Sequence, residues 1–208
     1  MFIVVEGPEG AGKTTLVRWL AARLLAEGRP VVTVREPGGT PVAEAARKIA
    51  LKSQHDLSPA VELFLILAAR ADLVARVIRP ALAGGQLVLA DRFELSTLCY
   101  QVAGRGLPAD AVDAALQLAT GGLVPDLTLV LDVPVDVGRE RLRRARKEPD
   151  RLERLDDAFH RRVLEAYRRA AGAGVVHIDA TGSKTAVQDA AWRTIGAAAL
   201  QLRVGGES

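Results

Sequence analysis

The sequence predicts an α/β fold in which a parallel β-sheet is flanked by helices. Three observations support this prediction: short apolar runs alternate with amphipathic stretches, the runs are rich in β-branched residues, and Gly, Pro or Asp bounds them. The chain has 208 residues, 49% of them hydrophobic, which is enough for one domain with a substantial core. We find no internal repeat and no linker rich in Pro, Gly or Ser. We therefore expect one domain covering residues 1–208.

Five segments have the composition of buried strands. A strand buried on both faces of a parallel sheet is a short, nearly continuous apolar run, and each segment has this pattern. The predicted strands are residues 2–6, 31–35, 87–91, 127–132 and 175–179.

Helical patterns occupy the intervals between these strands. The longest, residues 58–83, has Ser58 as a helix N-cap followed by Pro59, and it ends at Gly84-Gly85. Residues 204–208 are predicted to be a frayed tail. The predicted helices are residues 13–27, 41–51, 58–83, 94–103, 108–120, 134–146, 152–171 and 184–202.

The composition excludes several classes of protein. A single cysteine, Cys99, excludes an intrachain disulfide framework and favours a reducing compartment. No apolar stretch approaches the ~18 residues that span a bilayer, and residues 1–5 have the pattern of a strand, not of a signal peptide. We therefore expect a cytoplasmic protein. The formal net charge of +3 weakly favours anionic ligands.

A glycine-rich loop follows the first predicted strand. Its spacing matches G-x-x-x-x-G-K-[ST], and an apolar helical pattern begins immediately afterwards. Glycines let backbone N–H groups turn inward around a phosphate, and the helix N-terminus adds its positive dipole end. Lys13 would reach the β- and γ-phosphates of a nucleoside triphosphate, and the Thr14 hydroxyl would hold Mg²⁺. The predicted ATP-binding residues are Gly7, Pro8, Glu9, Gly10, Ala11, Gly12, Lys13, Thr14 and Thr15.

Polar residues also follow the second and third predicted strands. In an open parallel sheet, ligands bind beyond the carboxyl ends of the strands, so these groups share one rim. The rim combines arginines and carboxylates with hydroxyl and amide groups. It therefore predicts a second ligand that is anionic and forms hydrogen bonds. The groups are Arg35, Glu36, Pro37, Asp91, Arg92, Ser96, Tyr100 and Gln101.

Over almost its whole length the chain resembles bacterial thymidylate kinases, within the nucleoside monophosphate kinase family of P-loop proteins. The resemblance implies a P-loop kinase fold, the reaction ATP + dTMP → ADP + dTDP with Mg²⁺, and a homodimer packed through long helices. It implies small-molecule substrates, with neither nucleic acid nor a membrane as partner. The motifs that carry it are residues 7–15, 35–40, 91–92 with 96–97 and 100–101, 104–106, 125–128 with 131–132, and 150–153.

The resemblance also implies roles for individual residues. Glu9 lies near the sugar 3′-OH, and Arg47 and Arg92 hold the dTMP phosphate. Arg70 hydrogen-bonds the thymine base, and Asp91 supports Mg²⁺ through water together with Thr14. The implied catalytic residues of this rim are Lys13, Asp91 and Arg92. The implied substrate-binding residues are Glu9, Glu36, Pro37, Arg47, Ile66, Arg70, Arg92, Ser96, Tyr100 and Gln101.

A basic segment, residues 139–154, has the composition of a lid that closes over ATP. A mobile arginine can stabilise the charge that develops during phosphoryl transfer. Members of the family carry this arginine either in the phosphate loop or in the lid. The loop here has Gly10-Ala11 and no arginine, so we expect the lid to supply it. The candidates are Arg143, Arg144 and Arg146.

One position departs from the family pattern. The family usually has a phenylalanine four residues before the base-binding arginine, where its ring stacks on thymine; this chain has Ile66, and the nearby aromatic residue is Phe64. Isoleucine covers a base by dispersion but loses a stacking contribution of ~1–3 kcal/mol. Another nucleoside monophosphate kinase with a shifted base preference therefore remains open.

Other nucleotide-binding classes fit less well. A regulatory GTPase lacks support because the Asn-Lys-x-Asp signature is absent, and a mechanochemical ATPase lacks the acidic pair after the third strand. A nucleic-acid-binding module would be expected to carry stacking aromatic residues, which make up only 4% of the chain.

Overall fold

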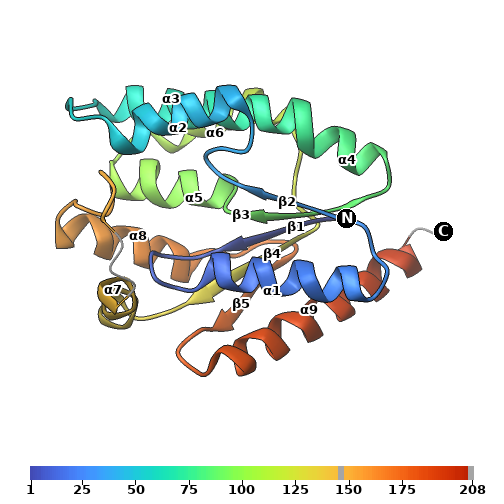
Figure 1. Ribbon diagram of the computed structural model, residues 1–208. Helices are drawn as coiled ribbons and strands as arrows, with labels where there is room; N and C mark the ends of the chain where they lie inside the picture. Colours follow the sequence, from blue (N-terminus) through green and yellow to red (C-terminus); the bar gives the residue numbers. More distant parts are fainter. Residues whose placement is uncertain (145–147, 206–208) are drawn as a thin grey trace.

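A computed structural model describes residues 1–144 and 148–205. Five parallel strands form one sheet in the order β2-β3-β1-β4-β5 (Figure 1). Each predicted strand is confirmed with its predicted bounds. The strands are β1 Phe2–Glu6, β2 Val31–Arg35, β3 Leu87–Asp91, β4 Leu127–Asp132 and β5 Val175–Asp179.

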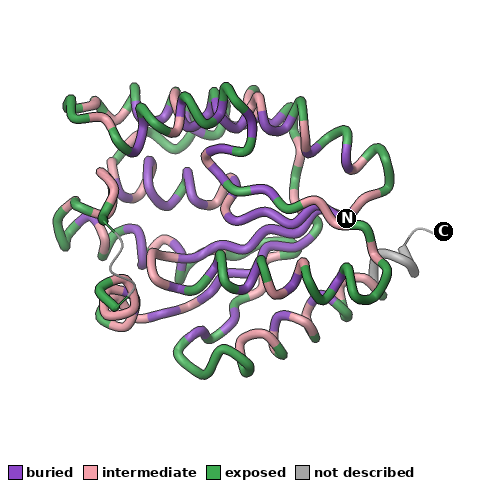
Figure 2. The backbone as a smooth tube through the Cα atoms, viewed as in Figure 1, coloured by how far each residue is buried: buried purple, intermediate pink, exposed green. Residues whose placement is uncertain are grey.

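Alternate residues of the central strands enter different cores. Ile3 and Leu89 belong to the cluster on one face of the sheet, whereas Phe2, Val4 and Val88 belong to the cluster on the other. Successive side chains of a strand point to opposite faces, so one apolar strand supplies both clusters. The central strands are accordingly buried throughout in Figure 2.

Helices cover both faces of the sheet. One face is covered by α1 (Lys13–Ala26) and α9 (Lys184–Gly205), which meet where Trp19 and Trp192 pack edge to face with ring centroids 6.3 Å apart. The other helices lie over the opposite face or beyond the carboxyl ends of the strands (Figure 1). They are α2 Pro41–Lys52, α3 Pro59–Leu73, α4 Arg79–Ala83, α5 Glu94–Thr97, α6 Ala109–Thr120, α7 Val135–Arg144 and α8 Asp157–Arg169.

Two predicted α-helices contain π-helical segments instead. The helix predicted at residues 58–83 is α3, the π-helix η1 (Val74–Ile78) and α4; Pro80 follows η1 and lacks the amide hydrogen that a regular α-helix would use. The helix predicted at 94–103 is α5 followed by the π-helix η2 (Leu98–Gly104), where the Arg105 amide bonds the Tyr100 carbonyl at 2.9 Å. The wider turns change which side chains share a face.

The helix predicted at residues 152–171 begins later, at Asp157. Residues before it form a separate turn, in which the Asp150 carboxylate accepts from the Leu152 and Glu153 amides, both at 3.0 Å. Asp156 then caps α8 by accepting from the Phe159 amide at 2.7 Å. Side-chain capping competes with helix continuation, which explains the later start.

The remaining differences lie at helix ends. Helix α9 continues to Gly205, so the predicted tail is wrong for residues 204–205. Arg146, the third lid candidate, lies outside the described residues. Within the described ranges, no helix combines the length and apolarity needed to cross a membrane.

The topology brings the predicted ligand-binding segments together. The phosphate loop follows β1, and Asp91-Arg92 ends the neighbouring strand β3. Helix α1 follows β1 over one face, whereas α5 follows β3 over the other (Figure 1). Chain segments that leave adjacent strands on opposite sides leave a crevice between them, where ligands of α/β proteins bind.

Thr40 fixes the start of α2 beside this crevice. Its hydroxyl accepts from the Ala43 amide at 3.1 Å and donates to the Asp72 carboxylate at 2.5 Å. The same hydroxyl therefore caps α2 and joins it to α3.

We expect Thr40→Ala to lower the free energy of unfolding by ~1–2 kcal/mol, because it removes the helix cap. Thr40→Ser keeps the hydroxyl and should restore most of this loss. Urea titration followed by the fluorescence of Trp19 and Trp192 measures both variants. Equal stability of Thr40→Ser and Thr40→Ala would show that the hydroxyl is not the cause.

Candidate functional site

A cavity of about 720 Å³ lies beyond the carboxyl ends of the strands. It reaches from the phosphate loop to α3 and brings together most of the side chains predicted from the sequence. The predicted site residues that line it are Glu9, Gly10, Ala11, Gly12, Lys13, Thr14, Thr15, Glu36, Pro37, Arg47, Ile66, Arg70, Asp91, Arg92, Ser96, Tyr100 and Gln101.

The phosphate loop ends where α1 begins. Gly12 precedes the helix with a φ of 97°, in the left-handed region that favours glycine, and it leaves the first amides of α1 without a side-chain cap. The Lys13 ammonium donates to the carbonyls of Gly7 at 2.9 Å and Pro8 at 2.7 Å, so it lies across the loop.

Lys13 is an electrostatically perturbed cation. Burial, together with the positive charge of Arg92, lowers the pKa of Lys13 to about 8, against the opposing attraction of Glu9, Asp91 and Glu6. Each of these effects acts on the charged form of the ammonium. A polyanion bound in the loop would favour that charged form.

Thr14 and Asp91 place a hydroxyl and a carboxylate side by side next to the loop. The Thr14 hydroxyl donates to the Asp91 carboxylate at 2.5 Å. Among the described residues, no group of three or more His, Cys, Asp or Glu side chains is arranged to hold a metal ion. One hydroxyl and one carboxylate fit Mg²⁺, which uses one or two protein oxygens and completes its shell with phosphates and water.

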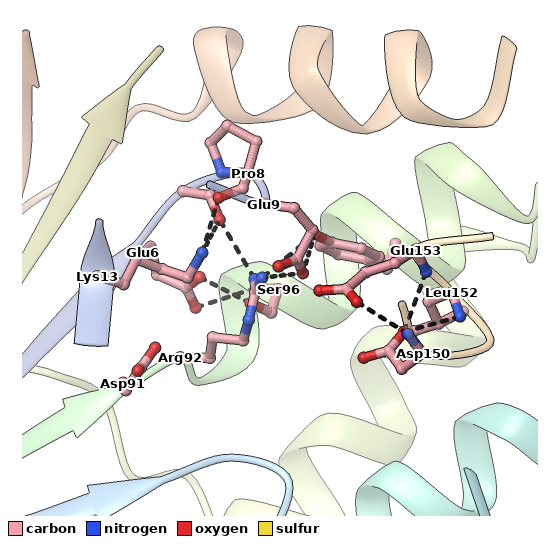
Figure 3. Close-up of polar contacts among 12 residues, drawn as sticks. Glu6, Pro8, Glu9, Lys13, Asp91, Arg92, Ser96, Asp150, Leu152 and Glu153 are labelled. Carbon is pink, nitrogen blue, oxygen red and sulfur yellow. Dashed lines mark hydrogen bonds and ion pairs between the residues drawn. The ribbon is translucent and has the colours of Figure 1, made fainter. Parts of the chain in front are cut away.

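Arg92 lies at the centre of the cavity and contacts the loop and three hydroxyl groups. Its guanidinium forms an ion pair with Glu9 and donates to Ser96 at 3.0 Å (Figure 3). It also donates to Tyr167 at 3.0 Å and to Tyr100 at 3.3 Å. Tyr100 in turn donates to Glu9 at 3.0 Å. One face of Arg92 is thus held by the protein, and its position is set before any ligand binds.

The backbone of Arg92 has an unusual conformation. Its φ of 76° lies in the left-handed region, which costs a non-glycine residue ~1–3 kcal/mol. The Arg92 amide bonds the Val5 carbonyl at 3.0 Å, continuing the β1–β3 pairing by one residue. This hydrogen bond and the side-chain contacts hold the conformation.

Glu6, at the end of β1, holds the two hydroxyl groups of Ser96 and Tyr167 to which Arg92 donates. It is fully buried and accepts from the Phe93 amide at 2.8 Å, the Ser96 hydroxyl at 2.7 Å and the Tyr167 hydroxyl at 3.0 Å. Sequence reasoning missed both Glu6 and Tyr167. A carboxylate that ends an otherwise apolar strand was a usable signal for Glu6, whereas Tyr167 carries no such signal.

Arg70 and Glu36 form a buried ion pair at the far end of the cavity. The Arg70 guanidinium donates to Glu36 at 2.6 Å, to the Thr97 hydroxyl at 2.9 Å and to the Phe93 carbonyl at 2.9 Å. Burial, which outweighs the attraction of Arg70, raises the pKa of Glu36 to about 7. The second Glu36 carboxylate oxygen accepts no hydrogen bond within the described part of the chain.

Ile66 lies beside this pair and lines the cavity with 8% of its surface exposed. Phe64 is 64% exposed and does not line the cavity. The aromatic ring two positions away therefore does not take the place of the family phenylalanine.

Arg47 reaches the cavity from α2. Its guanidinium donates to the Pro37 carbonyl at 2.7 Å, and burial together with Arg35 lowers its pKa. Positive charges that lower one another's pKa attract an anionic ligand. Arg47 on α2 and Arg92 after β3 place two positive charges in the cavity, which favours an anionic ligand there.

Helix α7, which enters the segment predicted to be a lid, packs closely on the phosphate loop. A Cβ at Gly10 would lie 2.2 Å from the Gly138 carbonyl oxygen, so the two glycines let the backbones touch. Arg141, further along α7, lines the cavity and donates to the Ala180 carbonyl at 2.9 Å. Sequence reasoning did not single out Arg141, because it is one of many arginines in the segment.

The candidates Arg143 and Arg144 point elsewhere. Both are exposed and pair with Glu140, at 2.9 and 2.8 Å, and neither lines the cavity.

The beginning of α9 contributes further lining residues that the sequence did not identify. These are Lys184, Val187 and Gln188.

Comparison with known proteins gives a consistent result. The sequence matches the thymidylate kinase family over residues 5–191. It is 51% identical over 172 residues to a thymidylate kinase of Pseudomonas putida strain W619, covering 82% of this chain and 83% of the relative. It is 48% identical over 197 residues to that of Thermomicrobium roseum, covering 93% of each chain. For Deinococcus radiodurans the identity is 43% over 198 residues, covering 94% and 96%.

The family match spans the phosphate loop, Arg92 and helix α7, all of which contribute residues to the cavity. The chain belongs to the thymidylate kinase family.

Proposed function

We propose that this protein transfers the γ-phosphoryl group of ATP to dTMP, giving dTDP and ADP. An oxygen of the dTMP phosphate forms the new bond to the γ-phosphorus, and the bond to the β–γ bridging oxygen breaks. The main support is one cavity that joins a phosphate loop, a central pair of arginines and a buried Arg70 end.

The donor phosphates would bind at the loop. The amides at the start of α1 and the Lys13 ammonium would contact the β- and γ-phosphates. Thr14 and Asp91 would hold Mg²⁺, which when bound neutralises charge on these phosphates.

The acceptor would lie between α2 and η2. Arg92 and Arg47 would hold the dTMP phosphate in line with the donor. Glu9 would accept a hydrogen bond from the sugar 3′-OH, and the adjacent Tyr100 ring would disfavour a 2′-OH. At the base, Arg70 and Gln101 would provide hydrogen bonds, and Ile66 would cover the ring by dispersion.

The lid would supply the arginine that stabilises the transferring phosphoryl group. Arg143, Arg144 and Arg146 remain our candidates, and Arg141 joins them because it lines the cavity. For the first two, this role would require the Glu140 pairs to open when the lid closes.

The direct test is ADP formation from Mg·ATP with dTMP, dUMP, UMP, CMP, AMP and GMP, each supplied separately. We expect a strong preference for dTMP, because Ile66 still presents an apolar face to the base. A preference for another monophosphate would support the alternative kinase with a shifted base preference. Absence of turnover with every acceptor would refute a monophosphate kinase.

We expect ATP binding to take up protons near pH 8. The Lys13 pKa is about 8 without ligand, and the ATP phosphates favour the charged ammonium, so binding raises this pKa. Above pH 8 the Kd for ATP should rise ~10-fold per pH unit. Calorimetry at pH 8 in two buffers of different ionisation enthalpy measures the uptake. Lys13→Arg, which stays charged, should show none; wild-type binding without proton exchange would contradict the assignment.

We also propose that the protein is a cytoplasmic homodimer. Its single cysteine fits a reducing compartment. Helix α3 exposes Val61 at 45% and Phe64 at 64%, three residues apart and therefore on one helical face. An exposed aromatic residue next to another apolar one is typical of an interface.

We expect wild-type protein to behave as a dimer of 22.1 kDa chains and Phe64→Glu to behave as a monomer, because the new charge would be buried in the interface. Size-exclusion chromatography with light scattering measures both masses. Leu25→Glu on α1, where the leucine is 59% exposed, is the matched control and should remain dimeric. A monomeric wild type would exclude this interface.

A further inference from the structure

Glu62 lies where three distant segments of the chain meet. It belongs to α3 and is fully buried. Its carboxylate accepts from Gln101 at 2.9 Å and from Arg105 at 2.7 Å, and it pairs with Arg151. Arg151 also donates to the Ala50 carbonyl at 2.9 Å. Sequence reasoning did not identify Glu62 as a site residue, and it does not line the cavity.

Two guanidinium groups keep this carboxylate ionised. Burial works to raise its pKa, but hydrogen bonds from Arg105, Gln101 and Arg151 hold the pKa of Glu62 below its ordinary value. An ionised carboxylate has no proton to donate and can only accept hydrogen bonds. Every group that forms a hydrogen bond with Glu62 must therefore be the donor.

This requirement decides which way the Gln101 amide points. The amide can meet Glu62 only through its NH₂ group, because its oxygen would face a carboxylate oxygen. Gln101 lines the cavity, and within the described part of the chain its side-chain oxygen accepts no hydrogen bond. The amide oxygen is thus left for a ligand in the cavity.

Arg70, which also lines the cavity, is a hydrogen-bond donor rather than an acceptor. It donates to Thr97, which lies four residues before Gln101 on the continuous α5–η2 helix. A guanidinium has five N–H groups, and Glu36, Thr97 and Phe93 use three of them. The two remaining N–H groups of Arg70 and the oxygen of Gln101 supply the donor and the acceptor that a base edge with a C=O next to an N–H requires.

We propose that Glu62 is a positioning residue that orients the Gln101 amide and so makes the site select a base that donates at N3, such as thymine, over one that accepts there, such as cytosine. This inference rests on the proposed dTMP kinase activity. Glu62 itself touches no substrate and acts through Gln101.

Glu62→Gln tests the proposal. The new amide can face Gln101 with its own NH₂ group while its oxygen binds the arginines, so Gln101 can turn and present NH₂ to the cavity. The assay measures kcat/KM with dTMP and with 5-methyl-dCMP, which keeps the 5-methyl group and changes only the C4–N3 edge. We expect the ratio of the two kcat/KM values to fall at least tenfold.

Two matched variants separate orientation from general damage. Glu62→Asp remains ionised and should keep the wild-type ratio even if its Tm falls. Arg105→Met removes one ion pair but leaves Glu62 paired with Arg151, so it should lower Tm without changing the ratio. An unchanged ratio in Glu62→Gln, or an equal change in Arg105→Met, would overturn the proposal.

If Glu62→Gln lacks a cooperative melting transition, Gln101→Met tests the same oxygen with the Glu62 cluster intact. Its ratio should also fall at least tenfold, and an unchanged ratio would overturn the proposal. The wild-type measurement keeps the two hypotheses apart. Failure of wild type to use dTMP refutes the proposed function, whereas normal wild-type activity with an unaltered variant ratio refutes only the role of Glu62.

Discussion

The buried carboxylate of Glu6 is the constraint on which the rest of the site depends. It ends β1, binds the amide of Phe93 and the hydroxyls of Ser96 and Tyr167, and through those hydroxyls supports Arg92. Hydrogen bonds from α5 and α8 to both Glu6 oxygens offset the cost of burying this carboxylate, and they tie β1 to the two helices. That arrangement holds Arg92 in a left-handed conformation next to the phosphate loop. The hydrogen bonds of this network therefore stabilise the strained backbone conformation of Arg92.

Six of the cations in the cavity wall or behind it differ in their partners. Arg92 with Glu9, Arg70 with Glu36, and Arg105 and Arg151 with Glu62 each have a carboxylate partner, so their positions are set by the protein. In the described residues, Lys13 and Arg47 have hydrogen-bond contacts only to backbone carbonyls, and both have a lowered pKa. Unpaired cations gain most from an arriving phosphate. The paired cations thus form the frame, and the unpaired ones carry the electrostatic attraction for nucleotides.

The π-helix η2 contributes two neighbouring residues to the site. Tyr100 and Gln101, adjacent residues of η2, both line the cavity. Tyr100 then reaches Glu9 at the sugar end, and Gln101 reaches Glu62 behind the base end. Adjacent residues of η2 therefore contact two different parts of the site.

The sequence alone determined the five parallel strands, the phosphate loop and the rim that includes Arg92, because apolar runs and glycine spacing are local properties of the chain. Arg70 was identified only through the family resemblance. The tertiary structure decided the rest. Glu6, Glu62 and Tyr167 matter because of partners 39 to 161 residues away, and no local pattern encodes such distances. The same holds for the basic segment, where the sequence does not distinguish one arginine from the next. Only packing places Arg141 at the cavity and leaves Arg143 and Arg144 exposed. Burial and long-range hydrogen bonding are properties of the folded chain, and they give residues of the same type different exposure, partners and pKa values.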